Sequence, residues 1–230
     1  MIFRRRPKKD DVTEESVEGV AGDADAAATA DDETGVKPGV SRGRGPWDRS
    51  ETTQDADDAA YVDLGGMVVR GAEGIELRLQ VDEQAQTVAS VLLAGPESGL
   101  ELRAFAAPRH DGIWDEVRSD IAAEAVKRGG TATEQDGEYG TELNVVVPVQ
   151  APDGRQATQA SRIVGVDGPR WMLRGTFLGK SAQGADLDGI LETAFRAIIV
   201  VRGDAPMAPR SMLPLEMPAQ TQPIGDSPDA

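Results

Sequence analysis

The stretch that decides the fold reads Gly165-Val166-Asp167-Gly168-Pro169-Arg170-Trp171-Met172-Leu173-Arg174-Gly175. It joins two short apolar runs through residues that favour a turn. Glycine tolerates positive φ, aspartate can bond its own backbone, and proline fixes φ. We therefore expect residues 163–166 to fold back on residues 171–177 as a β-hairpin.

The second strand of this hairpin has two different faces, because strand side chains alternate with a period of two. Trp171 shares one face with Leu173 and Phe177, which predicts a buried tryptophan. Arg170 and Arg174 share the other face, about 13 Å apart at about 3.3 Å per residue. Two interpretations of the arginines stay open: the charged outer face of an ordinary antiparallel sheet, or a surface that binds an acidic partner.

Composition narrows the class of protein. The 230-residue chain has no cysteine, which excludes disulfides and thiolate zinc sites and is typical of the reducing cytoplasm. Its net charge of −16 argues against a general nucleic-acid binder, which needs a basic face to neutralise phosphates. No apolar run approaches the length of about 18 residues that a membrane span needs. We therefore expect a cytoplasmic protein with no nucleic-acid partner.

Composition also divides the chain into three expected parts. Residues 1–58 form a basic and then acidic arm, too poor in apolar residues to offset the entropy of ordering, and so predicted to be disordered. Residues 59–203 form the core domain. Residues 204–230 form a proline-rich, extended tail, whose first apolar residues can lie across the domain.

The N-terminal arm opens with a basic cluster and continues with acids. The cluster consists of Arg4, Arg5, Arg6, Lys8 and Lys9, and residues 10–35 then carry ten acidic residues and no basic one. Acids stand where the apolar core of a signal peptide would follow, so no export signal is expected. Each basic residue contributes about 1 kcal/mol near an anionic surface, which predicts only weak membrane-surface contact without a second anchor.

Hydrophobic periodicity predicts an α+β fold. We expect a helix near residues 111–128, with Asp111 as its N-cap, and a second helix from about residue 186 to Gly203. The expected strands are residues 61–64, 67–70, 75–81, 87–93, 100–107, 131–135, 143–149, 158–166 and 171–177. This order predicts a single, mostly antiparallel sheet of about six to eight strands covered by two amphipathic helices, similar in topology to the Mog1/PsbP-like fold.

Residues outside the hairpin that could form a site are few. His110, the only histidine, lies beside Arg109 and Asp111. It could act as a general base at a substrate site, or it could be a loop residue beside a helix cap; the absence of a visible nucleophile favours the second interpretation. Trp47 stands in a polar linker, which suggests a docking anchor for this domain or for a partner. The candidate binding residues are Arg170, Arg174, Arg109, His110 and Trp47.

No catalytic residue, metal site or cofactor is predicted. The acids near His110 lack a recognisable ligand spacing, and the helix dipole explains their position in a first turn. Gly179-Lys180-Ser181 is similar to the end of a phosphate-binding loop, but Arg174 stands where that motif needs its first glycine. Other familiar nucleotide, zinc-protease and serine-hydrolase motifs do not occur in the chain.

Several segments together carry a family resemblance. They are Gly45-Pro46-Trp47-Asp48, Val62-Asp63-Leu64-Gly65, residues 104–109 with residues 112–118, residues 164–175, and Leu213-Pro214-Leu215. These segments, which are distributed over most of the chain, resemble the uncharacterised actinobacterial family DUF3710, a domain of unknown function. The resemblance implies a cytoplasmic actinobacterial protein and supplies no activity, ligand or catalytic residue.

Two hypotheses for function remain. The first is a non-enzymatic protein-interaction or scaffold module that binds an unknown protein partner, because the chain presents surfaces but no recognisable chemistry. The alternative is a small-ligand-binding protein, or an enzyme without a recognisable motif.

Overall fold

The computed structural model describes residues 44–52, 60–82, 87–151 and 153–218. All of them belong to one unit of the chain, Thr34–Ala230. The basic cluster at Arg4 to Lys9, most of the expected N-terminal arm, and the end of the expected tail lie outside the described residues.

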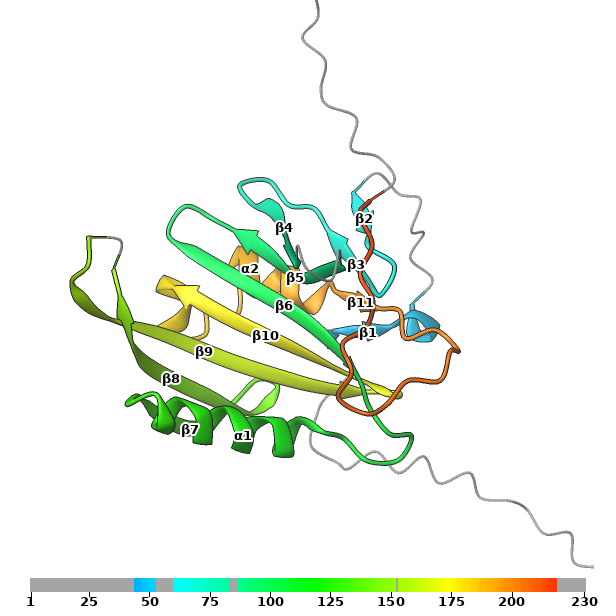
Figure 1. Cartoon of the computed structure of the whole chain (residues 1–230). Helices are drawn as coiled ribbons and strands as arrows, with labels where there is room; N and C mark the ends of the chain where they lie inside the picture. Colours follow the sequence, from blue (N-terminus) through cyan, green and yellow to red (C-terminus); the bar gives the residue numbers. More distant parts are fainter. Residues whose placement is uncertain (1–43, 53–59, 83–86, 152, 219–230) are drawn as a thin grey trace, which may run out of the picture. The chain divides into compact units, whose positions relative to one another are not determined.

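A seven-stranded antiparallel sheet, here called the main sheet, organises the fold (Figure 1). Its spatial order is β4-β5-β6-β10-β9-β8-β7. The strands are β4 (Glu76–Asp82), β5 (Thr87–Ala94), β6 (Ser98–Ala106), β7 (Thr131–Gly137), β8 (Gly140–Gln150), β9 (Gln156–Gly168) and β10 (Trp171–Gly179). This sheet and two helices confirm the expected α+β class with a mostly antiparallel sheet.

A second, smaller sheet corrects the expectation of a single sheet. Its order is β1-β11-β3-β2, formed by β1 (Trp47–Asp48), β2 (Tyr61–Asp63), β3 (Met67–Arg70) and β11 (Ile199–Val200). β11 lies where the second helix was expected to continue. The buried, β-branched Ile199 and Val200 instead pair with β3 on one side and β1 on the other, which gives their backbone groups partners inside the fold.

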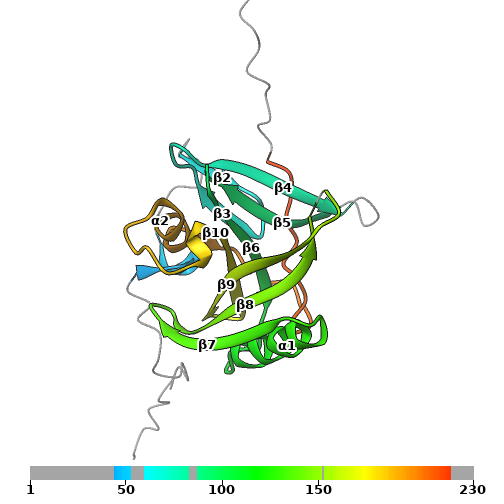
Figure 2. The same ribbon diagram turned by 90° about the vertical axis from the view of Figure 1, so that its left-hand side faces the viewer.

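The two helices cover opposite faces of the main sheet (Figure 2). Trp114 and Val117 of α1 (Trp114–Lys127) pack with Met172 of β10, whereas Phe195 of α2 (Ile190–Arg196) packs with Trp171, the neighbour of Met172. Adjacent strand residues point to opposite faces, so each helix buries its own side of the sheet. The remaining helical elements are the short 3₁₀ turns η2 (Arg49–Glu51) and η3 (Lys180–Ala182).

The hairpin of β9 and β10 forms as expected, but its turn lies one step later than the Asp-Gly pair predicts. Gly168 pairs directly with Trp171, so Pro169 and Arg170 are the two turn residues. Arg170 has φ of 64°. It therefore lies in the turn and does not share a strand face with Arg174. The expected burial of Trp171 is confirmed, since its side chain is 0% exposed.

The rest of the signature stretch fastens α1 to the sheet. The Asp167 carboxylate accepts hydrogen bonds from the amides of Ile113 (2.9 Å) and Trp114 (3.3 Å) at the start of the helix. This replaces the expected cap by Asp111, which is exposed. A Cβ at Gly165 would lie 2.1 Å from the Trp114 ring, so only glycine leaves room for that ring.

Segments on both sides of residues 59–203 pack against the core. The Trp47 amide donates to the carbonyl oxygen of Ile198 (2.9 Å), and the Trp171 indole donates to Asp48 (2.7 Å). At the other end, the Leu213 amide donates to the carbonyl oxygen of Ala104 (2.9 Å). The packed unit therefore extends beyond the expected core limits in both directions.

Candidate functional site

Three loops meet at one end of the main sheet, where β6 ends and β10 begins (Figure 1). The Ala107 amide donates to the carbonyl oxygen of Arg170 (2.8 Å), and Arg202 Nε donates to the same oxygen (3.1 Å). The loop of residues 107–113, which carries Arg109 and His110, begins at this contact. We call Arg109, His110, Arg170 and Arg202 the arginine end.

The backbone at this end is held in an unusual conformation. Arg170 and Arg210 are the non-glycine residues with positive φ in the described chain, at 64° and 69°. The Arg210 amide donates to the carbonyl oxygen of Ala106 (2.8 Å), so both arginines flank the end of β6. A left-handed conformation costs a residue with a Cβ about 1–2 kcal/mol, and such strain clusters at ligand-binding sites.

Positive charge at the arginine end is not neutralised by ion pairs within the described residues. No carboxylate there lies within ion-pair distance of Arg109, Arg170 or Arg202, whereas Arg210 pairs with Asp120 on α1. Burial, and then the charge of Arg170, lowers the pKa of Arg202. Arg109 and His110 are exposed, and Arg170 and Arg202 are half-buried. Hydrogen bonds to backbone carbonyls hold the Arg202 guanidinium, and Asp111 and Asp204 lie in the same loops without forming an ion pair to these arginines.

The sequence-predicted site residues are thus only partly brought together. The loop that carries Arg109 and His110 begins beside the turn that carries Arg170, but Arg174 lies on the face of β10 that also carries Met172 and α1. Trp47 is half-buried in the small sheet, paired with Ile199. Sequence reasoning missed Arg202, because no local pattern indicates that its guanidinium reaches a carbonyl in the β9–β10 turn.

A buried ionic cluster lies under α2, on the face of the main sheet opposite to α1. Arg162 on β9 donates to Glu142 on β8 (2.9 Å) and to Glu192 on α2. These three residues are 0%, 1% and 2% exposed. The Arg162 guanidinium also lies over the Phe177 ring, at 4.1 Å from its centroid. Sequence reasoning missed the cluster. The signal for it was Arg162, which lies two residues before Val164 and so shares the inward face of the same strand.

The charges in this cluster do not balance, since one guanidinium faces two carboxylates. Burial raises the pKa of Glu192, and the Arg162 charge opposes that effect. Glu142 Oε1 has no hydrogen-bond partner among the described residues. Burial, and next the Glu192 charge, raises the pKa of Tyr139, whose hydroxyl lies 3.5 Å from that carboxylate. The cluster is closed off from solvent, so we assign it to the packing of α2.

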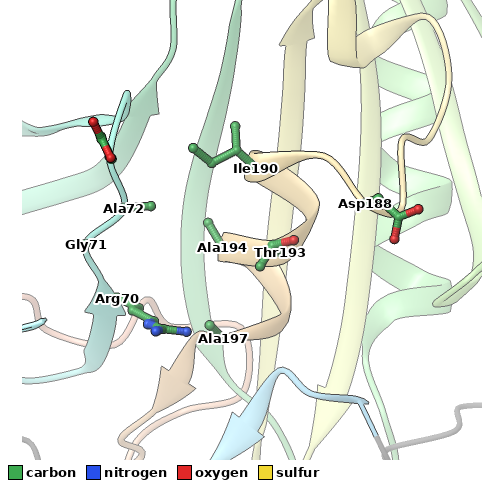
Figure 3. Close-up of a pocket in the computed structure, with 9 residues that line it drawn as sticks. Arg70, Gly71, Ala72, Asp188, Ile190, Thr193, Ala194 and Ala197 are labelled. Carbon is green, nitrogen blue, oxygen red and sulfur yellow. The ribbon is translucent and has the colours of Figure 1, made fainter.

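An open groove of about 510 Å³ lies between α2 and the loop after β3 (Figure 3). In Figure 3, Ile190 and Ala194 on the helix face Arg70 and Ala72 across the groove. Thr193, the hydroxyl-bearing residue here, accepts a hydrogen bond from Arg196 and has no histidine beside it, because the single histidine is His110. The groove can hold a small molecule but lacks an assembled nucleophile and base.

Neither a metal centre nor a membrane-spanning helix occurs within the described ranges. No group of three or more His, Asp or Glu residues there could hold a metal ion. None of the helices in that part of the chain is long and apolar enough to cross a membrane.

The fold and this end define an α+β protein with an antiparallel main sheet, a helix on each face and a cluster of unpaired cations at one end. The chain belongs to the family DUF3710, described as a protein of unknown function, whose family model matches residues 45–223. This match confirms the family resemblance read from the sequence. A search of curated proteins found no match.

Proposed function

We propose that this chain is a protein-interaction module whose arginine end binds an acidic segment of a partner protein. The proposal rests on two observations. Arg202 reaches the carbonyl oxygen of Arg170, and the loop that carries Arg109 begins at the same oxygen; none of these three arginines forms an ion pair within the described residues. Guanidinium groups bind carboxylates through paired hydrogen bonds, which are stronger than those between neutral groups.

The strained backbone supports the same proposal. Glycine would adopt the conformation of Arg170 without steric cost, so an arginine at φ of 64° retains a positive side chain at the expense of stability. A function that needs the charge explains that choice of residue. The hydrogen bonds of Arg202 to the carbonyl oxygens of Arg170 and Ala205 (3.1 Å each) hold its guanidinium in place before a partner arrives.

Net charge favours a short acidic protein segment over nucleic acid. The whole chain carries −16 at neutral pH, so a long polyanion would meet repulsion beyond the arginine end. A segment with a few Asp or Glu side chains would contact only the basic end. The same reasoning keeps membrane-surface contact through the Arg4 to Lys9 cluster a weak, secondary contribution.

We also propose a cytoplasmic location, an actinobacterial source and a relationship to the Mog1/PsbP-like fold. The lack of cysteine supports a cytoplasmic location, and the family resemblance supports an actinobacterial source. The order of strands, α1, more strands and α2 supports a relationship to the Mog1/PsbP-like fold.

A labelled hexaglutamate peptide provides the direct test. Fluorescence anisotropy should show saturable binding that weakens with salt, and a hexalysine peptide should not compete. Replacing Arg109 by Gln and Arg170 by Gly should weaken binding at least about tenfold, since one charged hydrogen bond contributes about 1.5–3 kcal/mol. Arg78→Gln, an exposed arginine of β4, is the matched control. Equal affinity of the double variant and the control would refute the proposal.

The groove in Figure 3 supports the alternative of a small-ligand-binding protein. A thermal-shift screen against metabolites and nucleotides tests it. A saturable rise in melting temperature that Thr193→Trp, at an exposed residue of the groove, abolishes while the arginine variants keep it would favour this alternative.

A further inference from the structure

Two arginines lie directly opposite each other on the face of the main sheet that α1 partly covers. Arg103 of β6 and Arg174 of β10 are register partners in the antiparallel ladder. Directly opposed residues have Cβ atoms about 4.5–5.5 Å apart, where like charges destabilise a sheet. The fold therefore keeps an unfavourable pairing near the middle of its main sheet.

One carboxylate serves the two guanidiniums. Glu101 accepts a hydrogen bond from Arg103 Nε (2.6 Å). Arg174 has no ion-pair partner within the described chain; its guanidinium stacks on Phe105, at 5.5 Å from the ring centroid. Burial, followed by the Arg103 charge, lowers the pKa of Arg174. This group of side chains thus keeps one unneutralised positive charge in a half-buried position.

The surroundings hold the arginines in place without sealing them from solvent. The ring of Phe105 packs against the cluster beneath α1, and the Trp114 ring fills the space left by Gly165, the β9 partner of Arg174. α1 lies over β7, β8 and β9 (Figure 1, Figure 2). The Arg103 side chain is 33% exposed, so a ligand can reach it.

We propose that Arg103 and Arg174 form a binding site for an oxyanion group, a carboxylate or a phosphate. Such a group supplies the missing negative charge, relieves the repulsion between the two guanidiniums and accepts hydrogen bonds from both. This site is separate from the arginine end, because it lies along β6 and β10 on the α1 face. It can therefore fail while the proposed function stands, and the reverse also holds.

Thermal denaturation in matched salts tests the site. Potassium phosphate and potassium acetate should raise the melting temperature by about 3 °C or more over potassium chloride of equal ionic strength, with saturation. Arg174→Gln should remove most of this rise. Arg78→Gln should retain it, because Arg78 is an exposed arginine paired with Glu76 on β4.

The melting temperature of the variants in chloride shows whether Arg174 binds an anion or only stabilises the fold. Removing one of two opposed cations should leave the melting temperature of Arg174→Gln in chloride unchanged or higher. If Arg174→Gln does not fold, Arg103→Gln provides the same comparison. Arg174→Lys should bind the anion several-fold more weakly, because it keeps the charge and loses the planar fork.

The hexaglutamate peptide distinguishes an oxyanion group on an acidic protein segment from one on a small ligand. A response to the peptide that Arg174→Gln reduces, without a response to free anions, assigns the group to an acidic protein segment. A saturable response to phosphate or acetate assigns it to a small ligand. The proposal would be overturned if the melting temperature of the parent protein were the same in every salt and Arg174→Gln bound the peptide as tightly as the parent. Equal responses of Arg174→Gln and Arg78→Gln to the anions would also overturn it.

Discussion

Arg162→Met is the substitution that tests the buried ionic cluster most directly. Methionine fills much of the same volume and keeps an apolar contact with the Phe177 ring, so the main loss is the charge. Glu142 and Glu192, both almost fully buried, would then face each other without a cation. Breaking a buried ion pair by removing one partner costs about 3–5 kcal/mol. Because a domain of this size has a typical stability of about 5–15 kcal/mol, this loss is a large share of the total.

Urea denaturation measures this loss through the shift of the midpoint at constant m-value. Arg78→Met is the matched control, since Arg78 pairs with Glu76 on the exposed surface and such pairs contribute about 0–1 kcal/mol. Lowering the pH should restore part of the stability of Arg162→Met, because burial raises the pKa of Glu192 and its protonation removes one of the two facing charges. The reasoning is refuted if Arg162→Met costs no more than Arg78→Met, or if its loss is the same at acid and neutral pH.

Glu192, Arg170 and Gly165 each allow a test by a single substitution. Burial raises the pKa of Glu192 in the folded state. Its contribution to stability should therefore be present below the unfolded pKa, at about 4.3, and be lost as the pH rises through the higher folded pKa. Glu192→Gln should remove this pH dependence in urea titrations across the same range. Arg170→Gly should leave unfolding free energy unchanged or increase it by up to about 1 kcal/mol, because glycine adopts positive φ freely, and a loss above about 1 kcal/mol would contradict this. Gly165→Ala should lower the melting temperature by several degrees, as its Cβ would overlap the Trp114 ring, whereas Gly184→Ala, at an exposed glycine with open space and no positive φ, should cost less; equal costs would argue against that close packing.

Local patterns in the sequence were sufficient to predict the class of fold. Alternating apolar residues located the central strands, turn residues located the β9–β10 hairpin, and both features depend on neighbours within a few positions. The burial of Trp171 followed from the same alternation, since one face of an antiparallel strand packs on the core. The helix near residues 111–128 was also predictable, because a 3.6-residue apolar period and its terminal charges are local features.

The tertiary structure alone decided where the functional candidates lie. The register of β9 against β10 moved Arg170 from a strand face into the turn, and a one-residue change of register reverses which side chains share a face. Asp167 replaced Asp111 at the start of α1 because the folded sheet brings its carboxylate to amides more than fifty positions away. Arg202 joins the arginine end for the same physical reason. Its partner is a backbone carbonyl in another loop, and only the packed sheet brings residues so distant in sequence within hydrogen-bonding distance.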